Sequence, residues 1–472
     1  MHYSSLLVEE AYYWNYTQHL DFSYLDHPPM VALLIKTFTM IFGTQEFFIR
    51  LPSLLCWAIA AFFSYQLSEL MNKGAGLYSV MLLAILPFYF FESIIITPDA
   101  PLIACWSASV YCLYRSLVLN EAHYWYATGF WLGLGMLSKY TICLLGLAAL
   151  FYIIITPKCR FWFLRKEPYI GVLISLILFI PVIYWNINHE WSSFLFQSQS
   201  RFNSVSSIDI HKLIGLVLLF MTPLGTWGLV ELIKKTPDKA LLTHVGIKKF
   251  ILIFTLIPLG FFALFCLNHK IKFNWIGPVF LALIPWIGSL ISYNTYKRIL
   301  WFRMAFILLL TYSSILLVMS YNKSPVVQQK AFAKIIDWKS LIKQFNQVAR
   351  TVELKNHMSP IFVPLDNYPI ASELNFYQTK FLADHQITKK YPVIGSHLFG
   401  AESLMYRYWD TYEQVLGMPL IIISKELWRF DDIQLITRII ELSPLKTVWA
   451  RSEGQGVKSI PYYYKVVQMK NV

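Results

Sequence analysis

The sequence predicts a polytopic α-helical membrane protein with a soluble α/β domain at its C-terminal end. Of its 472 residues, 56% are hydrophobic and only 14% are charged, against about 45–50% and about 25% in an average soluble domain. So few polar side chains cannot cover the surface of a soluble protein of this length. The composition therefore excludes a cytosolic enzyme, a disordered chain and a fibrous protein.

Apolar segments long enough to span a bilayer follow one another from residue 51 to residue 320, and they form the predicted transmembrane domain. We expect about ten transmembrane helices there. They lie at 51–70, 75–96, 101–119, 124–137, 140–156, 169–187, 211–232, 249–267, 273–293 and 299–320. Residues 30–42 are apolar but too short to span, and Lys36 interrupts them, so a helix lying in the membrane interface is expected.

The positive charges predict the orientation. The chain has 40 Lys and Arg residues against 27 Asp and Glu residues. If residues 1–47 lie outside the membrane, most Lys and Arg residues of the short loops lie on the inner side, as the positive-inside rule requires. Residues 1–50, the loop at 188–210 and everything after about residue 321 then face outward, which in a bacterial inner membrane is the periplasm. Because residues 1–47 follow neither a signal peptide nor an apolar segment, we expect the native protein to have a further transmembrane helix upstream.

The composition changes after Tyr321. Short apolar stretches alternate there with helical patterns, which is typical of an α/β domain over 321–472. The apolar stretches are Pro360–Leu365, Pro419–Ile423, Leu445–Ala450 and Tyr462–Val467, and the helical patterns cover about 328–350, 368–378 and 431–442. Residues 267–472 contain no cysteine, so no disulfide is expected within this domain.

Ionisable side chains gather in the first thirty residues. Glu9 and Glu10 lie at the start of a helical stretch, where the positive end of the helix dipole stabilises acidic groups. This stabilisation explains one acid at that position but not two. Asp26 and His27 precede Pro28-Pro29, which fixes a rigid, extended backbone. A rigid backbone that presents an acid and a histidine beside the bilayer suits a preorganised site. The interleaved aromatic residues, also typical of an interfacial belt, include Tyr12, Tyr13 and Tyr24.

Other polar residues fall on the same outer face. Asp99 joins two predicted helices within a Pro-Asp-Ala-Pro turn, and Lys139 occupies a tight outer turn, where it could also simply reach toward the interface. Arg201 lies in the long outer loop, and Lys272 and Trp275 lie at the outer end of another predicted helix. Cations in this region could hold a phosphate, and carboxylates could take a proton from a hydroxyl.

Several motifs resemble those of a known family. In the first outer loop they are Glu9-Glu10-Ala11-Tyr12-Tyr13-Trp14, Tyr24-Leu25-Asp26-His27-Pro28-Pro29-Met30-Val31-Ala32 and Phe48-Ile49-Arg50-Leu51-Pro52-Ser53. Further motifs are Thr97-Pro98-Asp99-Ala100-Pro101, Gly133–Thr141, Trp185-Asn186, Arg201-Phe202, Asp366-Asn367-Tyr368 and Asn375-Phe376-Tyr377. The chain thereby resembles the bacterial polyprenyl-phosphate-sugar-dependent membrane glycosyltransferases of the GT-C fold. These include lipid A aminoarabinose transferases, galacturonosyl transferases and, more distantly, protein O-mannosyltransferases.

The resemblance implies roles for individual residues. Glu9 stands where the family has its catalytic Asp, and Glu10 stands where it has the adjacent acid. Asp26 and His27 match an acid-plus-cation pair beside the donor phosphate, with Tyr24 two residues before them. Arg201 and Lys139 match a family arginine and a family lysine, so they are assigned to the phosphate with His27. The residues expected to line the substrate site are Tyr12, Tyr13, Asp99, Lys272 and Trp275.

The chain departs from the family at three points. Glu9 is one methylene longer than the usual Asp, which shifts the position of a base. Some members bind a divalent metal through the second acid and a histidine three residues before the arginine, and Ser198 occupies that histidine's position here. A metal is therefore possible rather than required. The family's first transmembrane helix has no counterpart in this sequence.

Residues and resemblance together predict a glycosyltransferase of the inner membrane. It would move a sugar from a polyprenyl-phosphate carrier to lipid A, a polysaccharide or a protein, with inversion at the anomeric carbon and with no nucleic acid involved. Two alternatives stay open: an inactive family member kept for binding, and a transporter of lipid-linked sugars. A transporter should carry its charges at mid-membrane rather than at the outer rim. The sequence leaves the sugar and the acceptor undetermined.

Overall fold

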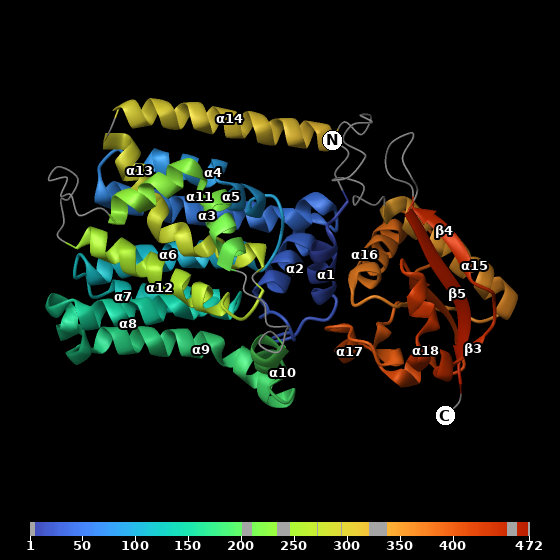
Figure 1. Cartoon of the computed structure of the whole chain (residues 1–472). Helices are drawn as coiled ribbons and strands as arrows, with labels where there is room; N and C mark the ends of the chain where they lie inside the picture. Colours follow the sequence, from blue (N-terminus) through green and yellow to red (C-terminus); the bar gives the residue numbers. More distant parts are fainter. Residues whose placement is uncertain are drawn as a thin grey trace. The chain divides into compact units, whose positions relative to one another are not determined.

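The computed structural model describes residues 5–200, 210–233, 246–270, 272–293, 295–320, 338–450 and 460–470. The chain divides into two compact units. The helical unit comprises Asp21–Leu34 and Arg50–Thr311, and the mixed unit comprises Met1–Leu20, Ile35–Ile49 and Tyr312–Val472. Figure 1 shows the course of the chain through its helices and strands.

The first part of the chain is helical. Its α-helices are α1 (Val8–Tyr16), α2 (Met30–Phe42), α3 (Glu46–Met71), α4 (Gly76–Ile85), α5 (Pro87–Glu92), α6 (Asp99–Leu117), α7 (Tyr124–Met136), α8 (Cys143–Ile155), α9 (Lys166–Asn188), α10 (Ser192–Leu195), α11 (Ile210–Ile233), α12 (Ile247–Phe265), α13 (Leu283–Tyr293) and α14 (Thr295–Ser320). Shorter helical turns are η1 (Tyr140–Ile142), η2 (Pro157–Leu164), η3 (Phe196–Ser200), η4 (Phe273–Trp275) and η5 (Gly277–Ala282). The predicted short helix at residues 30–42 is present as α2; its place in the membrane interface stays a prediction.

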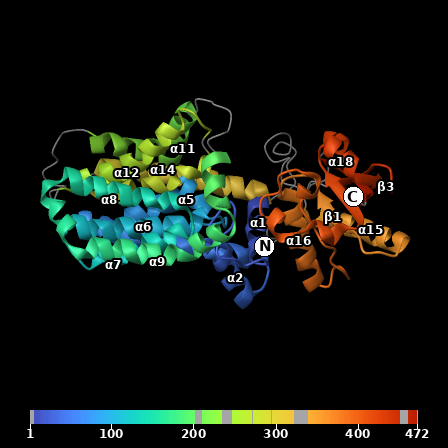
Figure 2. The same cartoon turned by 90° about the horizontal axis from the view of Figure 1, so that it is seen from below.

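Small residues bring the helices of the helical unit close together. Helices α6, α7 and α9 lie side by side in both views of the chain (Figures 1 and 2). Where α7 meets α9, a Cβ on Gly129 would lie only 2.1 Å from the carbonyl oxygen of Gly171. Only glycine permits this approach, which is a common device for packing helices inside a membrane.

The outward face of α9 is apolar. Leu173, Ile177 and Ile180 are each more than half exposed, although they are among the most hydrophobic residue types. Such a stripe would aggregate in water but suits contact with lipid. The exposed surface therefore agrees with the membrane character predicted from composition.

Three helices, α3, α9 and α12, are each long and apolar enough to cross a membrane, and two bent pairs would raise the number to five in the described residues. The predicted number of about ten remains a prediction. Several expected spans are divided in the structure, as where 75–96 forms α4 and α5. Leu86 is extended there because Pro87 follows it, and this ends α4.

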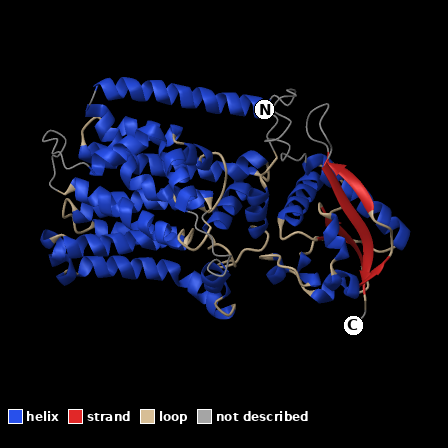
Figure 3. Cartoon of the chain, in the orientation of Figure 1, coloured by secondary structure: helices blue, strands red, loops and turns tan. Residues whose placement is uncertain are grey.

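The mixed unit contains the predicted α/β region. Figure 3 shows its strands together in one sheet, whose order is β1-β2-β5-β3, with β4 also paired to β5. The strands are β1 (Ile361–Pro364), β2 (Pro419–Ser424), β3 (Ile439–Glu441), β4 (Lys446–Ala450) and β5 (Ile460–Met469). β1 is parallel to β2, whereas β2, β3 and β4 pair antiparallel to β5. Each predicted apolar stretch thus contributes a strand.

Helices complete this unit. They are α15 (Trp338–Asn356), α16 (Pro369–Ala383), α17 (Tyr406–Trp409) and α18 (Ile433–Arg438), with short turns η6 (Ser396–Phe399), η7 (Tyr412–Val415) and η8 (Leu427–Asp431). The helical pattern expected over 431–442 is only partly helical. The side chain of Asp432 caps α18 by accepting from the N–H of Gln434, but Ile439–Glu441 pairs with β5 as a strand. The part of the first helical pattern before residue 338 lies outside the described residues.

The N-terminal helix belongs to the core of the mixed unit. The Trp14 ring meets that of Phe376 on α16 edge-on, with centroids 5.1 Å apart. The side-chain amide of Asn15 donates to the carbonyl of Ser372, and the N–H of Leu6 donates to the Tyr377 hydroxyl at 3.0 Å. Residues far apart in sequence therefore fold together, and α1 is held as part of this unit.

Candidate functional site

A buried ion pair lies at the head of α6. Asp99 is the first residue of this helix, where the helix dipole stabilises a carboxylate. The Asp99 side chain is fully buried. Lys139, between α7 and η1, places its Nζ 2.8 Å from Oδ1 and 2.7 Å from Oδ2 of Asp99. The amide of Asn274 donates to the same Oδ2. Two polar groups from distant parts of the helical unit therefore converge on one carboxylate.

A cavity of about 160 Å³ opens beside this ion pair. Its polar lining residues include His27, Asp99, Lys139 and Gln197. Its aromatic lining residues include Phe261, Phe262, Phe265 and Trp275, and the remaining lining residues are Pro28, Tyr140 and Thr141. A largely apolar cavity with a few convergent polar groups is the usual form of a ligand site.

The aromatic side of the cavity is well packed. The ring of Trp275 lies 5.3 Å from that of Phe265 and 6.3 Å from that of Phe262, measured between centroids. Phe261, Phe262 and Phe265 all come from the last turns of α12. Apolar ligand atoms could contact these rings while a charged group faced Lys139.

The loop before α2 presents Asp26 and His27. The N–H of Tyr24 donates to the carbonyl of His27 at 3.1 Å, which closes a tight turn. The Tyr24 hydroxyl accepts from the N–H of Asp21, and burial raises the pKa of this hydroxyl well above its usual value. Gln197 donates to the carbonyl of Asp26. Hydrogen bonds from Asp21 and Gln197 thus hold this turn, and the rigidity expected from the proline pair stays a prediction.

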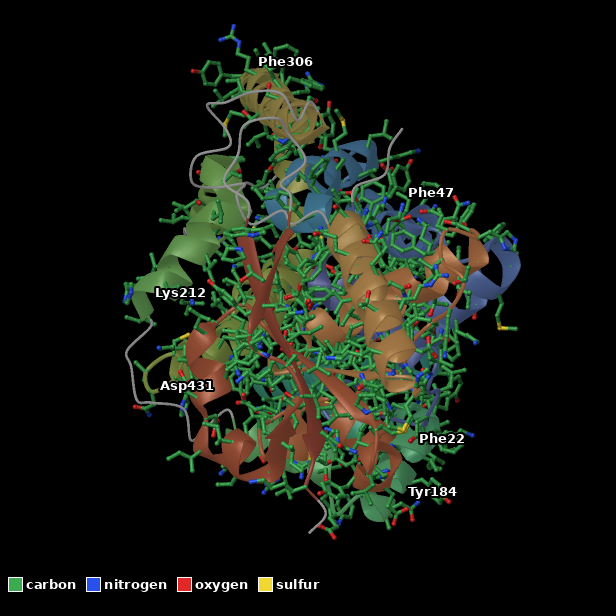
Figure 4. All side chains as sticks on the ribbon, turned by 90° about the vertical axis from the view of Figure 1, so that its right-hand side faces the viewer. Phe22, Phe47, Tyr184, Lys212, Phe306 and Asp431 are labelled. Atoms are coloured by element: carbon green, nitrogen blue, oxygen red, sulfur yellow. The ribbon has the colours of Figure 1, made fainter. Side chains whose placement is uncertain are left out.

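Helix α9 anchors the same loop. The indole N–H of Trp185 donates to Asp21 Oδ2 at 2.8 Å, and the Trp185 ring stacks on His189 with centroids 4.0 Å apart. Figure 4 shows Phe22 and Tyr184 beside one another, in an edge-on contact of 5.8 Å. The Trp185 part of the Trp-Asn motif therefore has a positioning role in the structure.

The two acids of α1 differ in their surroundings. Glu10 is fully buried, and its Oε2 accepts from the N–H of Leu7 at 2.9 Å. This bond satisfies a free backbone donor at the start of the helix. Glu9 is exposed. Glu10 therefore has a structural task, whereas the Glu9 carboxylate is open to a ligand.

Tyr12 and Tyr13 are buried in an aromatic cluster of the mixed unit. Tyr12 lies 4.7 Å from Tyr368 and 5.0 Å from Tyr16 between ring centroids, and Tyr13 lies 5.6 Å from Tyr16. The Tyr12 hydroxyl accepts from the N–H of Met405. These contacts give both residues a packing role, and their predicted contact with substrate stays a prediction.

The structure brings together Asp99, Lys139, His27 and Trp275 from the predicted site, around one cavity. Lys272 is exposed and does not line that cavity, and Arg201 lies outside the described residues. The hydroxyl of Ser198 donates to the carbonyl of Phe194. Within the described residues, no three His, Cys, Asp or Glu side chains are placed to hold a metal ion. Gln197 was not predicted, because nothing in the sequence distinguishes it from its polar neighbours.

The chain is similar to proteins of known type. Residues 26–185 match the model of the dolichyl-phosphate-mannose-protein mannosyltransferase family. A lipid A galacturonosyltransferase, RgtD of Rhizobium johnstonii, is 22% identical over 189 residues. That alignment spans 40% of this chain and 40% of the relative.

Solved structures match over nearly the full length. ArnT from Cupriavidus metallidurans in the apo state aligns with a TM-score of 0.65 at 13% identity, covering 98% of this chain and 94% of ArnT. The same protein bound to undecaprenyl phosphate aligns with a TM-score of 0.62 over the same shares of the two chains. These matches confirm the resemblance and the fold class predicted from the motifs.

Proposed function

Since this chain has the GT-C fold and carries the mannosyltransferase family pattern over residues 26–185, we propose that it is a membrane glycosyltransferase. It transfers a sugar from a polyprenyl phosphate to an acceptor on the outer face of the bacterial inner membrane. The acceptor is a lipid A-type glycolipid, in keeping with the name of its relative RgtD. The donor is in keeping with the lipid bound to ArnT.

The observation that carries this proposal is the mixed lining of the cavity in the helical unit. The lining includes Lys139 and His27 as well as Trp275 and phenylalanines of α12. A polyprenyl phosphate has the matching chemistry, with an anionic head and an apolar chain. Cations at the head stabilise the phosphate, and the aromatic wall removes apolar surface from water.

Lys139 has the bonding capacity for this role. An ammonium group has three N–H donors, and the two bonds to Asp99 use two of them. The third is available to a phosphate oxygen. Asp99 holds the ammonium group in place, and Asn274 in turn orients Asp99, so the cation is positioned before the donor arrives.

The reaction needs a base and a stabilised leaving group. An acceptor oxygen attacks the anomeric carbon and loses its proton to a base, and the bond from that carbon to the phosphate oxygen breaks. The electron pair leaves with the phosphate, whose growing charge is stabilised by Lys139 and His27. The family resemblance assigns the base to Glu9 and places Asp26 with His27 beside the donor phosphate. Direct displacement inverts the anomeric centre.

The test is a transfer assay on the purified full chain in detergent, with undecaprenyl-phosphate sugars and lipid A. We expect at least one carrier-linked sugar, galacturonic acid, aminoarabinose or a hexose, to appear on the acceptor by mass spectrometry. His27→Ala should lower this rate, whereas Lys158→Ala, a matched loss of an exposed cation, should not. Binding of the lipid without any transfer would instead support an inactive member kept for binding.

A further inference from the structure

A second concave site lies in the mixed unit, between α15 and the sheet. It is a groove of about 340 Å³. One wall is formed by the polar side chains of α15, and the other by β4 and β5, which lie beside α15 in Figure 1. All of its lining residues are described by the structure, and none belongs to the cavity of the helical unit.

The helix and the sheet each build their wall by their own periodicity. Gln347, Thr351 and Lys355 follow one another at four-residue spacing, so α15 presents them on one face. On the sheet, Lys446 lies directly opposite Tyr464 in the antiparallel pair of β4 and β5. Residues two apart share a face, so valines on these strands form an apolar floor beside the polar groups.

The charge of the groove is positive. Lys355 and Lys446 lie on opposite walls, and both side chains are exposed. No acidic residue lines the groove, and no ion pair of either lysine is found in the described part of the chain. Its two lysines are thus available to an anion.

Three other lysines of the same unit are neutralised. Lys389 pairs with Glu353, and Lys465 pairs with Glu441. Lys380 pairs with Glu46. The two lysines of the groove differ from these three, because they line an open space with no acidic residue in its lining.

Tyr464 is an aromatic lining residue of the groove that carries a hydroxyl group. Its ring is largely buried and lies 6.4 Å from that of Phe345 on α15, edge-on. Across the residues that the structure describes, its hydroxyl makes no hydrogen bond, although the residue lines the groove. A hydroxyl held by a packed ring is a preorganised donor and acceptor.

We propose that this groove binds an anionic carbohydrate, a sugar that carries phosphate or carboxylate groups. The valine floor suits the C–H face of a sugar ring, the side chains of Gln347, Thr351 and Tyr464 suit its hydroxyls, and the lysines suit its charges. The inference rests on the proposed function in one respect: it identifies the ligand as the sugar head of the acceptor. The groove is then where the soluble part recognises that acceptor.

The test measures binding without any donor, so that it does not depend on turnover. Titration calorimetry of the full chain in detergent would use a bisphosphorylated glucosamine disaccharide, its dephosphorylated form and inorganic phosphate. We expect the bisphosphorylated sugar to bind most tightly and to weaken as salt rises. The double variant Lys355→Ala, Lys446→Ala should weaken it about ten-fold.

Matched variants separate the groove from general charge. Lys425→Ala removes an exposed lysine elsewhere in the unit and should leave binding unchanged. Tyr464→Phe keeps the packed ring and should weaken binding of both sugars. Equal binding by the double variant and the parent would overturn the proposal, as would equal binding of inorganic phosphate and the disaccharide.

A second experiment identifies the source of the sugar by using the same head group carried on acyl chains in nanodiscs. If the lysine variants weaken binding of both the lipid and the free saccharide, the lipid head group is the ligand. If they weaken binding of the free saccharide only, the ligand is a soluble glycan. A parent chain that binds the sugar but transfers none would count against the proposed function and leave the groove standing. A double lysine variant that loses sugar binding but transfers at the parent's rate would show that the groove does not recognise the acceptor, and it would leave the proposed function standing.

Discussion

Lys139 donates to both carboxylate oxygens of Asp99, and the pair is almost completely buried, with side-chain exposures of 11% and 1%. Two charges at this depth are costly unless they neutralise each other. The pair has access to the cavity, however, and Lys139 retains one donor. The same two residues can therefore serve the fold and the ligand, and a single substitution cannot separate the two roles.

A double substitution can separate them. Lys139→Ala alone leaves Asp99 buried without its cation, which should cost about 3–5 kcal/mol of stability. Adding Asp99→Asn removes that uncompensated charge, and stability should largely return. Binding of undecaprenyl phosphate should stay weak in the double variant, since the ammonium group of Lys139 no longer faces the phosphate. Thermal unfolding and lipid binding of the same detergent preparations measure the two effects.

Full recovery of lipid binding in that double variant would contradict the assignment of Lys139 to the phosphate. The ion pair would then be purely structural. The single variant Asp99→Asn is the complementary control, because it keeps the cation and should keep measurable lipid affinity wherever the protein folds.

Asn274 is expected to position Asp99 rather than to bind the lipid itself. Its amide donates to Asp99 Oδ2, so Asn274→Ala removes one of three bonds to that carboxylate and should cost about 1–2 kcal/mol of stability. Asn274→Asp places a second carboxylate against Asp99 and should be worse. The ratio of kcat to KM for the donor should fall in that order, and an identical profile in both variants would refute the orienting role.

The two acids of α1 should respond differently to loss of charge. Glu9→Gln keeps the size of an exposed side chain and should leave folding unchanged, but a base that cannot take a proton should lower the transfer rate about 10²–10⁴-fold. Glu9→Asp should keep activity. Glu10→Gln retains an oxygen that can accept from Leu7, so its effect should be mild. Initial rates at matched protein levels decide, and an unchanged rate in Glu9→Gln removes it from catalysis.

Asp99 and Lys139, two residues of the predicted site, form an ion pair in the structure, and their role toward a ligand stays a prediction. Asp99 and Lys139 were identifiable because charged residues beside a bilayer are rare. A rare residue type can be recognised in the sequence without knowing the fold. The helix count depends on where spans are broken, and breaks such as that at Pro87 are set by packing as well as by composition. The sequence predicted that one of the two acids of α1 favours the helix dipole, and in the structure Glu10 accepts from the N–H of Leu7 at the start of that helix.

Other features could not be read from the sequence. The contact of α1 with α16 joins residues more than three hundred positions apart, as between Asn15 and Ser372, and no local pattern encodes such a pairing. The strand at Ile439–Glu441 follows an amphipathic run, and only its pairing with β5 makes it a strand. Gln197 contributes to the cavity through its place in η3, which the fold brings alongside Asp26.

The mixed unit should lose stability as pH rises through neutrality, because of Asp410. Burial raises the pKa of this carboxyl to about 7, against about 3.8 for the same group in the unfolded chain, and the N–H of Gly395 offsets only part of the cost. The folded state therefore binds a proton more tightly than the unfolded state between about pH 4 and pH 7, so stability falls across that window and is lowest above it.

Asp410→Asn keeps an acceptor for Gly395 without the charge. At pH 8 it should raise the unfolding free energy by about 1–2 kcal/mol. It should also flatten the decline of the thermal midpoint between pH 5 and 8, measured on the full chain in detergent. Asp431→Asn, an exposed acid in the same unit, is the matched control and should leave the slope as in the parent. An unaltered slope in Asp410→Asn would mean that another group titrates, with Asp366, whose pKa burial raises to about 6, next in line.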